Sequence, residues 1–146
     1  MARYVTKVRT SWAAEKAFAY MADLNNFARW DPGVRNVTQT EGTGGGPGAV
    51  FAVTVAGVPK DIVLTYHTIE YLAPTTVLVI AKSRVFTSED RITVTPDGGG
   101  SIVEYDAQLR LNGVLGFVDL ALRPFFNRIG ARAAQGLRVA LEGVAA

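Results

Sequence analysis

The stretch of sequence that decides the fold is residues 85–111, VFTSEDRITVTPDGGGSIVEYDAQLRL. Apolar and polar side chains alternate through both halves, and residues 96–100, PDGGG, interrupt the alternation. Alternation with period two is typical of half-buried β-strands, and a Pro-Asp-Gly sequence is typical of a turn. Strands joined by so short a connection pair antiparallel, because a parallel pair needs a crossover of about a dozen residues. We therefore predict an antiparallel hairpin with strands at 85–96 and 101–111.

The same pattern extends toward the N-terminus and ends only at residue 34. It predicts four more strands, separated by turns that contain Gly or Pro, at residues 34–40, 48–56, 60–72 and 75–83. Residues 3–10 also alternate and add a seventh strand. All connections within the run are short, so the strands form a meander and not a doubly wound parallel sheet.

Helical patterns occupy the two remaining regions. Residues 13–23 are rich in helix formers, with Ser11 placed to cap them, and a second short helical piece ends at Trp30 before a Pro-Gly pair. The chain closes with apolar residues at helical spacing over about 115–143. Two glycines inside that segment, Gly130 and Gly136, each cost about 1 kcal/mol relative to Ala. Either close approach to the sheet or simple tolerance accounts for them.

This order of elements predicts a single α+β domain over residues 1–146. A long antiparallel sheet twists strongly, and its concave face needs an apolar cover. One long helix can supply that cover, but a straight rod and a curved sheet do not fit everywhere. We therefore expect an internal cavity between them, since apolar pockets that bind small molecules enclose about 300–1,000 Å³.

Composition excludes several classes of function. The chain has 146 residues, a net charge of +2, one His and no Cys. It has no nucleic-acid-binding charge pattern, cannot form disulfides, and cannot build a two-His metal site within one chain. The glycine-rich residues 42–49 superficially match a dinucleotide fingerprint, but a strand follows where a helix N-terminus is needed to receive the pyrophosphate. We expect no cofactor and no metal.

The sequence also bears on localisation and assembly. The first ten residues have no apolar signal-peptide core, and no apolar run approaches the roughly 18 residues of a membrane span. We expect a cytoplasmic protein, a monomer or homodimer, with no integral membrane association and no nucleic-acid partner. The arginines of the last helical segment could meet anionic lipid head groups, but a solvated face is the preferred interpretation. They are Arg123, Arg128, Arg132 and Arg138.

Three stretches resemble the START/Bet v 1-like superfamily, which includes polyketide cyclase/dehydrase and lipid-transport proteins. They are residues 18–33 (FAYMADLNNFARWDPG), 66–74 (YHTIEYLAP) and 90–105 (DRITVTPDGGGSIVEY). The resemblance covers essentially the whole chain. It implies a helix-grip fold, in which a curved antiparallel sheet of about seven strands, two short helices and a long C-terminal helix enclose an internal cavity. Members include aromatase/cyclases, hydrolase-like enzymes, lipid carriers and ligand sensors, and the fold does not choose among them.

Strand parity sorts the side chains that could line such a cavity. Ile92 and Val94 mark the inward face of residues 85–96, which directs Ser88 and Asp90 into the cavity. In residues 60–72 we favour the set that contains Tyr66, Thr68 and Glu70 as inward, with His67 and Tyr71 in the opposite set. The candidate ligand-binding residues are Phe51, Val53, Tyr66, Thr68, Phe86, Ser88, Asp90, Tyr105, Leu109, Phe117 and Phe125.

Three of these residues are candidate catalytic groups: Asp90, Tyr66 and Ser88. As a general base, Asp90 could take a proton from an acidic carbon beside a carbonyl; the alternative is a structural role, through an ion pair with Arg84 or hydrogen bonds near the end of the strand. The phenol of Tyr66, like that of Tyr105, could donate to a ligand carbonyl or simply belong to the core. Ser88 could hydrogen-bond a ligand, but a Ser–His–Asp triad is disfavoured because the only histidine is on the opposite face. We interpret Trp30 as packed beneath the helical cover.

Three hypotheses for function follow. The favoured one is binding of a small hydrophobic or aromatic ligand, lipid-like or polyketide-like, in the cavity. The second is a polyketide cyclase/aromatase-type enzyme that promotes aldol cyclisation or dehydration, with Asp90 as acid and base. The third is a protein-interaction module without a ligand. Binding is ahead because the sequence lacks the obvious catalytic constellations.

Overall fold

The computed structural model describes residues 2–56, 60–111 and 119–146, with side chains for all of these except 119–126. The elements follow one another in the order β1 (Ala2–Thr10), α1 (Ala14–Ala22), the 3-10 turn η1 (Leu24–Asn26), α2 (Phe27–Trp30), β2 (Val34–Glu41), β3 (Val50–Val55), β4 (Ile62–Leu72), β5 (Thr76–Lys82), β6 (Phe86–Asp97), β7 (Gly100–Leu111), α3 (Asp119–Ala140) and β8 (Val144–Ala145). Every predicted strand is confirmed to within two residues at each end.

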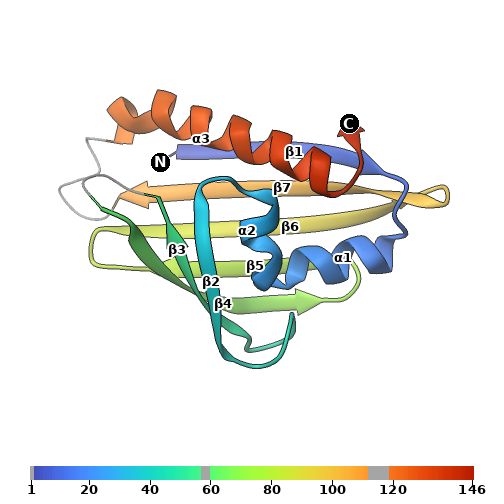
Figure 1. The fold of residues 1–146 in the computed structure, drawn as a ribbon, viewed down its shortest axis with the longest axis horizontal. Helices are drawn as coiled ribbons and strands as arrows, with labels where there is room; N and C mark the ends of the chain where they lie inside the picture. The colour runs from blue at the N-terminus through green and yellow to red at the C-terminus, as the bar shows by residue number, and fades with distance from the viewer. Residues whose placement is uncertain (1, 57–59, 112–118) are drawn as a thin grey trace.

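The strands form one antiparallel sheet in the order β2-β3-β4-β5-β6-β7-β1-β8. The hairpin of β6 and β7 is its longest uninterrupted ladder, paired from Phe86 and Leu111 to Asp97 and Gly100 without a shift in register. β1 pairs along the outer edge of β7. The sheet curves around the helices, as Figure 1 shows. The predicted meander is therefore confirmed.

The sheet has eight strands and not the predicted seven. The eighth, β8, has only two residues and pairs with β1 through Val8 and Arg9. The chain turns back at Glu142, whose φ of 54° is left-handed, and the N–H of Gly143 donates to the carbonyl of Arg138. This turn ends α3 at Ala140, three residues before the predicted end. A two-residue strand has no periodicity by which to recognise it.

Two groups of helices share the cover of the sheet. In the described contacts α3 packs on β1 and α2, whereas α1 packs on β6 and β7. Figure 1 shows α3 running along β1, with α1 and α2 in front of the central strands. The long helix therefore covers only part of the concave face, where it adds Ala133 and Leu137 to the core, and the two short helices cover its centre (Figure 1).

Close approach explains both glycines of α3. A Cβ atom added at Gly130 would lie 2.3 Å from Cγ of Tyr4 on β1. A Cβ atom added at Gly136 would lie 1.8 Å from the carbonyl oxygen of Trp30 at the end of α2. Both distances are too short for any side chain, so the two glycines set how near α3 lies to β1 and to α2.

Two local predictions need correction. Ser11 does not cap α1, whose N-cap residue is Ala13 with no side-chain capping bond. Instead, the hydroxyl of Thr10 accepts the N–H of Trp12 and donates to the carbonyl of Leu141. In β4, a shift in register between Thr68 and Glu70 reverses the alternation.

The consequence of this bulge is that Tyr71, assigned by parity to the outward set, turns toward the core. Its partner across β5 is the fully buried Val77, and its ring packs on Phe18 with ring centroids 5.3 Å apart. Parity predicts orientation only up to a bulge, and nothing in the sequence announces this one.

Candidate functional site

A cluster of polar side chains lies at the centre of the concave face. The hydroxyls of Tyr66 and Ser88 are hydrogen-bonded at 2.8 Å, and the hydroxyl of Tyr105 donates to Oδ2 of Asp90 at 2.6 Å. The ladders of β4, β5 and β6 fix this arrangement. Tyr66 on β4 and Ser88 on β6 both pair with Ala81 on the intervening strand β5. Because the side chain of Ala81 is only a methyl group, the phenol of Tyr66 can extend over it to the serine hydroxyl.

Asp90 is buried without a described cationic partner. Asp90 is 3% exposed, and it accepts a hydrogen bond from Tyr105 instead of forming the ion pair with Arg84 that was one of the two structural alternatives. Burial raises the pKa of Asp90 from its ordinary value of 3.8 to about 7, and the hydrogen bond from Tyr105 opposes that rise. The carboxyl group is therefore half-protonated near neutral pH and able to take up or release a proton there.

The two tyrosines of the cluster remain phenols. Burial raises the pKa of both Tyr66 and Tyr105 well above its usual value, and the nearby charge of Asp90 raises both further. A neutral phenol can donate one hydrogen bond and accept another. The two side chains are consequently suited to orient a carbonyl or hydroxyl group.

Thr68 adds a polar atom that lacks a partner. Its Oγ1 is buried and makes no hydrogen bond within the described part of the chain. Thr68 and Asp90 both pair with Val79, so they lie two strands apart, about 10 Å by the usual strand spacing. Buried polar atoms are almost always satisfied, so the free hydroxyl marks a place where a further hydrogen-bonding group fits.

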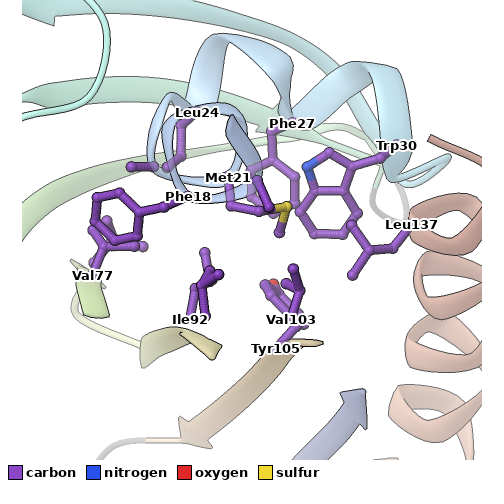
Figure 2. Close-up of a cluster of buried hydrophobic side chains, with 14 of the residues drawn as sticks. Phe18, Met21, Leu24, Phe27, Trp30, Val77, Ile92, Val103, Tyr105 and Leu137 are labelled. Atoms are coloured by element: carbon purple, nitrogen blue, oxygen red, sulfur yellow. The ribbon is translucent and has the colours of Figure 1, made fainter. Parts of the chain in front are cut away.

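Aromatic side chains from the short helices close over this cluster. Trp30 packs edge-on against Tyr105 with ring centroids 5.1 Å apart, and Phe27 stacks on Trp30 at 4.8 Å. Figure 2 shows Phe27 and Trp30 directed at the strands from above, with Met21 beside them and Leu137 approaching from α3. The interpretation of Trp30 as packed beneath the helical cover is confirmed, since it is 4% exposed.

The enclosed space beside Asp90 is small. It measures about 10 Å³, enough for one water molecule. The described residues lining it are Met21, Leu24, Phe27, Trp30, Val79, Asp90, Ile92 and Tyr105. The side chains of α1, η1 and α2 fill the space here that one straight helix over a curved sheet would leave open.

Most candidate residues occupy the predicted face. Those buried on the concave side are Phe51, Val53, Tyr66, Thr68, Ser88, Asp90 and Tyr105, while Phe86 and Leu109 are half-buried. Phe117 and the side chain of Phe125 lie outside the described residues. His67 is exposed on the opposite face, so Ser88 and Asp90 have no histidine beside them.

Sequence reasoning missed most of the side chains that close the site from above. Met21, Leu24 and Phe27 line the cavity, although the helical spacing in residues 18–30 suggested only that some of them are core. Their chemistry is purely apolar, so the sequence contained no sign that distinguishes a wall residue from a core residue.

Two kinds of feature are absent from the described residues, a metal site and a membrane-spanning helix. No group of three or more His, Cys, Asp or Glu side chains in residues 2–56, 60–111 and 119–146 could hold a metal ion. Among the described helices, none has both the length and the apolar character needed to span a membrane.

A curved antiparallel sheet closed by two short helices and a long C-terminal helix defines the helix-grip fold of START/Bet v 1-like proteins. The family model described as "Polyketide cyclase / dehydrase and lipid transport" matches residues 1–142. The chain therefore belongs to this family. No curated protein matches the sequence.

Solved structures agree on the fold. A START superfamily protein from Mycobacterium smegmatis aligns with a TM-score of 0.77 at 12% identity, covering 97% of this chain and 98% of that one. A STAR-related lipid transfer protein from Xanthomonas axonopodis aligns with a TM-score of 0.73 at 18% identity, covering 96% and 85%. The di-domain ARO/CYC StfQ of the steffimycin biosynthetic pathway aligns at 0.73 and 13% identity, covering 97% of this chain and 49% of StfQ. Likeness at these identities establishes the fold alone.

Proposed function

We propose that this protein binds a small hydrophobic or aromatic molecule, lipid-like or polyketide-like, between the concave face of the sheet and the short helices. The observation that carries the proposal is the carboxyl group of Asp90, which is buried with the Tyr105 phenol as its only described hydrogen-bond partner. A purely structural core gains nothing from such a group, because an acid buried without a cation costs stability. Together with Tyr66, Ser88 and Thr68, it would orient the oxygen atoms of a guest.

Binding beside Asp90 requires that the cover open, because the enclosed space there is only about 10 Å³. The covering segment consists of η1 with three residues and α2 with four. Helices this short have little stability of their own. Displacing Phe27 and Trp30 from the sheet is therefore the least costly way to make room. The displaced side chains lose apolar contacts, and an apolar guest would replace them by packing against Val79, Ile92 and Tyr105.

The test is a titration with N-phenyl-1-naphthylamine, an uncharged aromatic fluorophore whose emission rises in apolar surroundings. We expect saturable binding to the wild-type protein. Val79→Phe, which adds bulk to the floor of the site, should weaken binding at least several-fold. The control, Ile69→Phe, makes a similar change at an exposed position on β4, 61% exposed, and should bind like the wild type. Absence of saturable binding, or equal effects of the two variants once both are shown to be folded, would refute the proposal.

A second candidate is the cyclase or dehydratase activity, favoured by the pKa of about 7 for Asp90. In that reaction the Asp90 carboxylate takes a proton from the acidic carbon between two carbonyls of a poly-β-ketone chain. The enolate attacks another carbonyl of the same chain, and Asp90 returns the proton to the resulting alkoxide. Tyr105 and Tyr66 would polarise the carbonyls. Turnover of a poly-β-ketone mimic should disappear in Asp90→Asn while binding persists; turnover that survives the substitution would remove Asp90 from the mechanism.

The third candidate, an interaction module, is favoured by the small volume of the space beside Asp90, about 10 Å³. The outer face of β4 exposes Val63 and Ile69, each 61% accessible, which a partner could cover. It is distinguished from the binding proposal by the same titration, because an interaction module would take up no fluorophore between the sheet and the helices.

A further inference from the structure

A surface groove of about 380 Å³ separates α2 from the C-terminal half of α3. Its lining consists of Ala28, Arg29, Trp30, Pro32, Arg132, Gln135 and Gly136. Among the described residues, Trp30 is the one that lines both this groove and the small cavity beside Asp90. Trp30 thus lies between the two spaces, and displacing it would connect the groove to the interior.

The groove carries positive charge without a described counter-charge. Arg29 projects from α2 and Arg132 from α3, both exposed, and no described carboxylate forms an ion pair with either. Arg3, Arg9, Arg35 and Arg91 each pair with a carboxylate, whereas Arg84, Arg110, Arg128 and Arg138, like Arg29 and Arg132, form no ion pair with a described carboxylate. The nearest acidic residue in sequence, Asp31, is partly buried and accepts the N–H of Gly33 instead. Two guanidinium groups at one groove are a ready partner for a carboxylate or a phosphate.

The cavity on the inner side of Trp30 disfavours an anionic group, unlike the groove. Asp90 lies there without a described cation, so an anionic group placed beside it would be repelled and desolvated. The lining also includes the apolar side chains of Met21, Val79 and Ile92, which a neutral apolar chain would contact once Trp30 is displaced. The two ends therefore select for different halves of one molecule.

We propose that the ligand is an amphiphile with an anionic head group, bound with its head in the groove between Arg29 and Arg132 and its apolar part inserted past Trp30 toward Val79. This inference rests on the proposed binding function and adds the chemical class of the ligand and its orientation. Trp30 moves aside when the apolar part enters, and the uncompensated arginines keep the charged end outside.

The experiment compares three probes of equal chain length: dodecanoate, dodecyl phosphate and the uncharged dodecan-1-ol, each below its aggregation threshold. Binding is followed by tryptophan fluorescence in the variant Trp12→Phe. The sequence has only two tryptophans, so Trp30 is the only one left in this variant. We expect every bound probe to shift the emission of Trp30. At low salt the anionic probes should bind about tenfold more tightly than the alcohol, and the advantage should shrink as salt screens the arginines.

Arginine variants locate the head group. Arg29→Gln and Arg132→Gln should each remove most of the advantage of the anions and leave the affinity for dodecan-1-ol unchanged. Arg128→Gln is the matched control, because Arg128 is also exposed on α3 but does not line the groove. It should keep the advantage.

The possible outcomes distinguish failure of this inference from failure of the proposed binding function. If dodecan-1-ol binds as tightly as the two anions, or if Arg128→Gln acts like Arg132→Gln, the anionic head group is refuted and the hydrophobic binding site stands. If none of the three probes shifts Trp30, and the uncharged fluorophore also fails to bind, the binding function fails and the inference with it. An advantage limited to one of the two anions supports the inference and identifies the head group.

Discussion

The hydroxyl of Tyr105 lies 2.6 Å from Oδ2 of Asp90, and the ring of the same tyrosine meets the indole of Trp30 edge-on at 5.1 Å. One side chain therefore links the buried acid of the sheet to the aromatic residue that closes the cover. Any guest that displaces Trp30 changes the surroundings of Tyr105, and through it those of Asp90. Opening of the site and the protonation of its acid are coupled by this geometry.

Stability should fall as pH rises through the acid-to-neutral range. The pKa of Asp90 is about 7 in the folded protein and near 3.8 when unfolded. Between these values the unfolded chain has released the proton and the folded chain retains it, so folding becomes less favourable as pH increases, by up to about 4 kcal/mol. Above about pH 7 this contribution is constant. Burial raises the pKa of Asp31 in the same direction.

Asp90→Asn tests whether Asp90 causes this fall in stability with rising pH. The variant cannot titrate, so urea unfolding should give a smaller difference in stability between about pH 5 and about pH 8 than the wild type gives. At the higher pH the variant should be the more stable protein, because it no longer buries a charge. A wild type that is as stable at about pH 8 as at about pH 5, or a variant that keeps the full slope, contradicts the buried acid.

Tyr105→Phe should raise the pKa of Asp90 further. The phenol stabilises the carboxylate by donating to it, and the hydrogen bond is what limits the effect of burial. The titration of the Asp90 carboxyl carbon, followed by NMR, should move to higher pH in the variant. Tyr71→Phe is the control, since Tyr71 packs on Phe18 and makes no described hydrogen bond with Asp90. A shift to lower pH in Tyr105→Phe would show that the phenol does not act as the donor.

Gly136→Ala should separate α2 from α3. The added Cβ would lie 1.8 Å from the carbonyl oxygen of Trp30, so backbone must move. We expect a loss of about 1–3 kcal/mol in the free energy of unfolding, as for other overpacked sites. Gly99→Ala is the matched control, because nothing lies within 4 Å of a Cβ atom added there. Equal stabilities of the two variants would mean that the helices do not touch at this point.

Trp30→Ala should lower the stability of the protein and raise its affinity for the fluorophore. Removal of a buried tryptophan side chain is expected to lower the free energy of unfolding by about 3–5 kcal/mol. The same change opens the wall between groove and cavity, so the fluorophore should bind more tightly than to the wild type, and saturating fluorophore should recover part of the lost stability. If the variant binds no better than the wild type, Trp30 does not control entry.

The sequence predicted seven of the eight strands, the helical segments, the meander from β2 to β7 and the inward direction of Ser88 and Asp90, because each depends on local periodicity and on short connections. Ser88 and Asp90 could be assigned to the inner face since Ile92 and Val94 share it. The reversal at Tyr71 could not be predicted, because a bulge depends on pairing across strands and not on the residues of β4 alone. The volume of the cavity also escaped prediction, since the distance between α2 and the sheet is set by how Phe27 and Trp30 pack.

The groove between α2 and α3 was beyond sequence reasoning for the same reason. Arg29 and Arg132 are far apart in the chain, and each alone has the pattern of a solvated surface residue. Only the fold brings them to one groove, at the point where Gly136 lets the two helices meet.

The central claim is that an apolar guest enters between the sheet and the short helices. The most direct measurement is an NMR experiment on the complex with N-phenyl-1-naphthylamine, recording nuclear Overhauser contacts between its aromatic protons and the methyl groups of the protein. The account predicts contacts with Val79 and Ile92, on the floor beneath Trp30. Contacts confined to Val63 and Ile69 on the outer face, or no contacts with any methyl group, would contradict it.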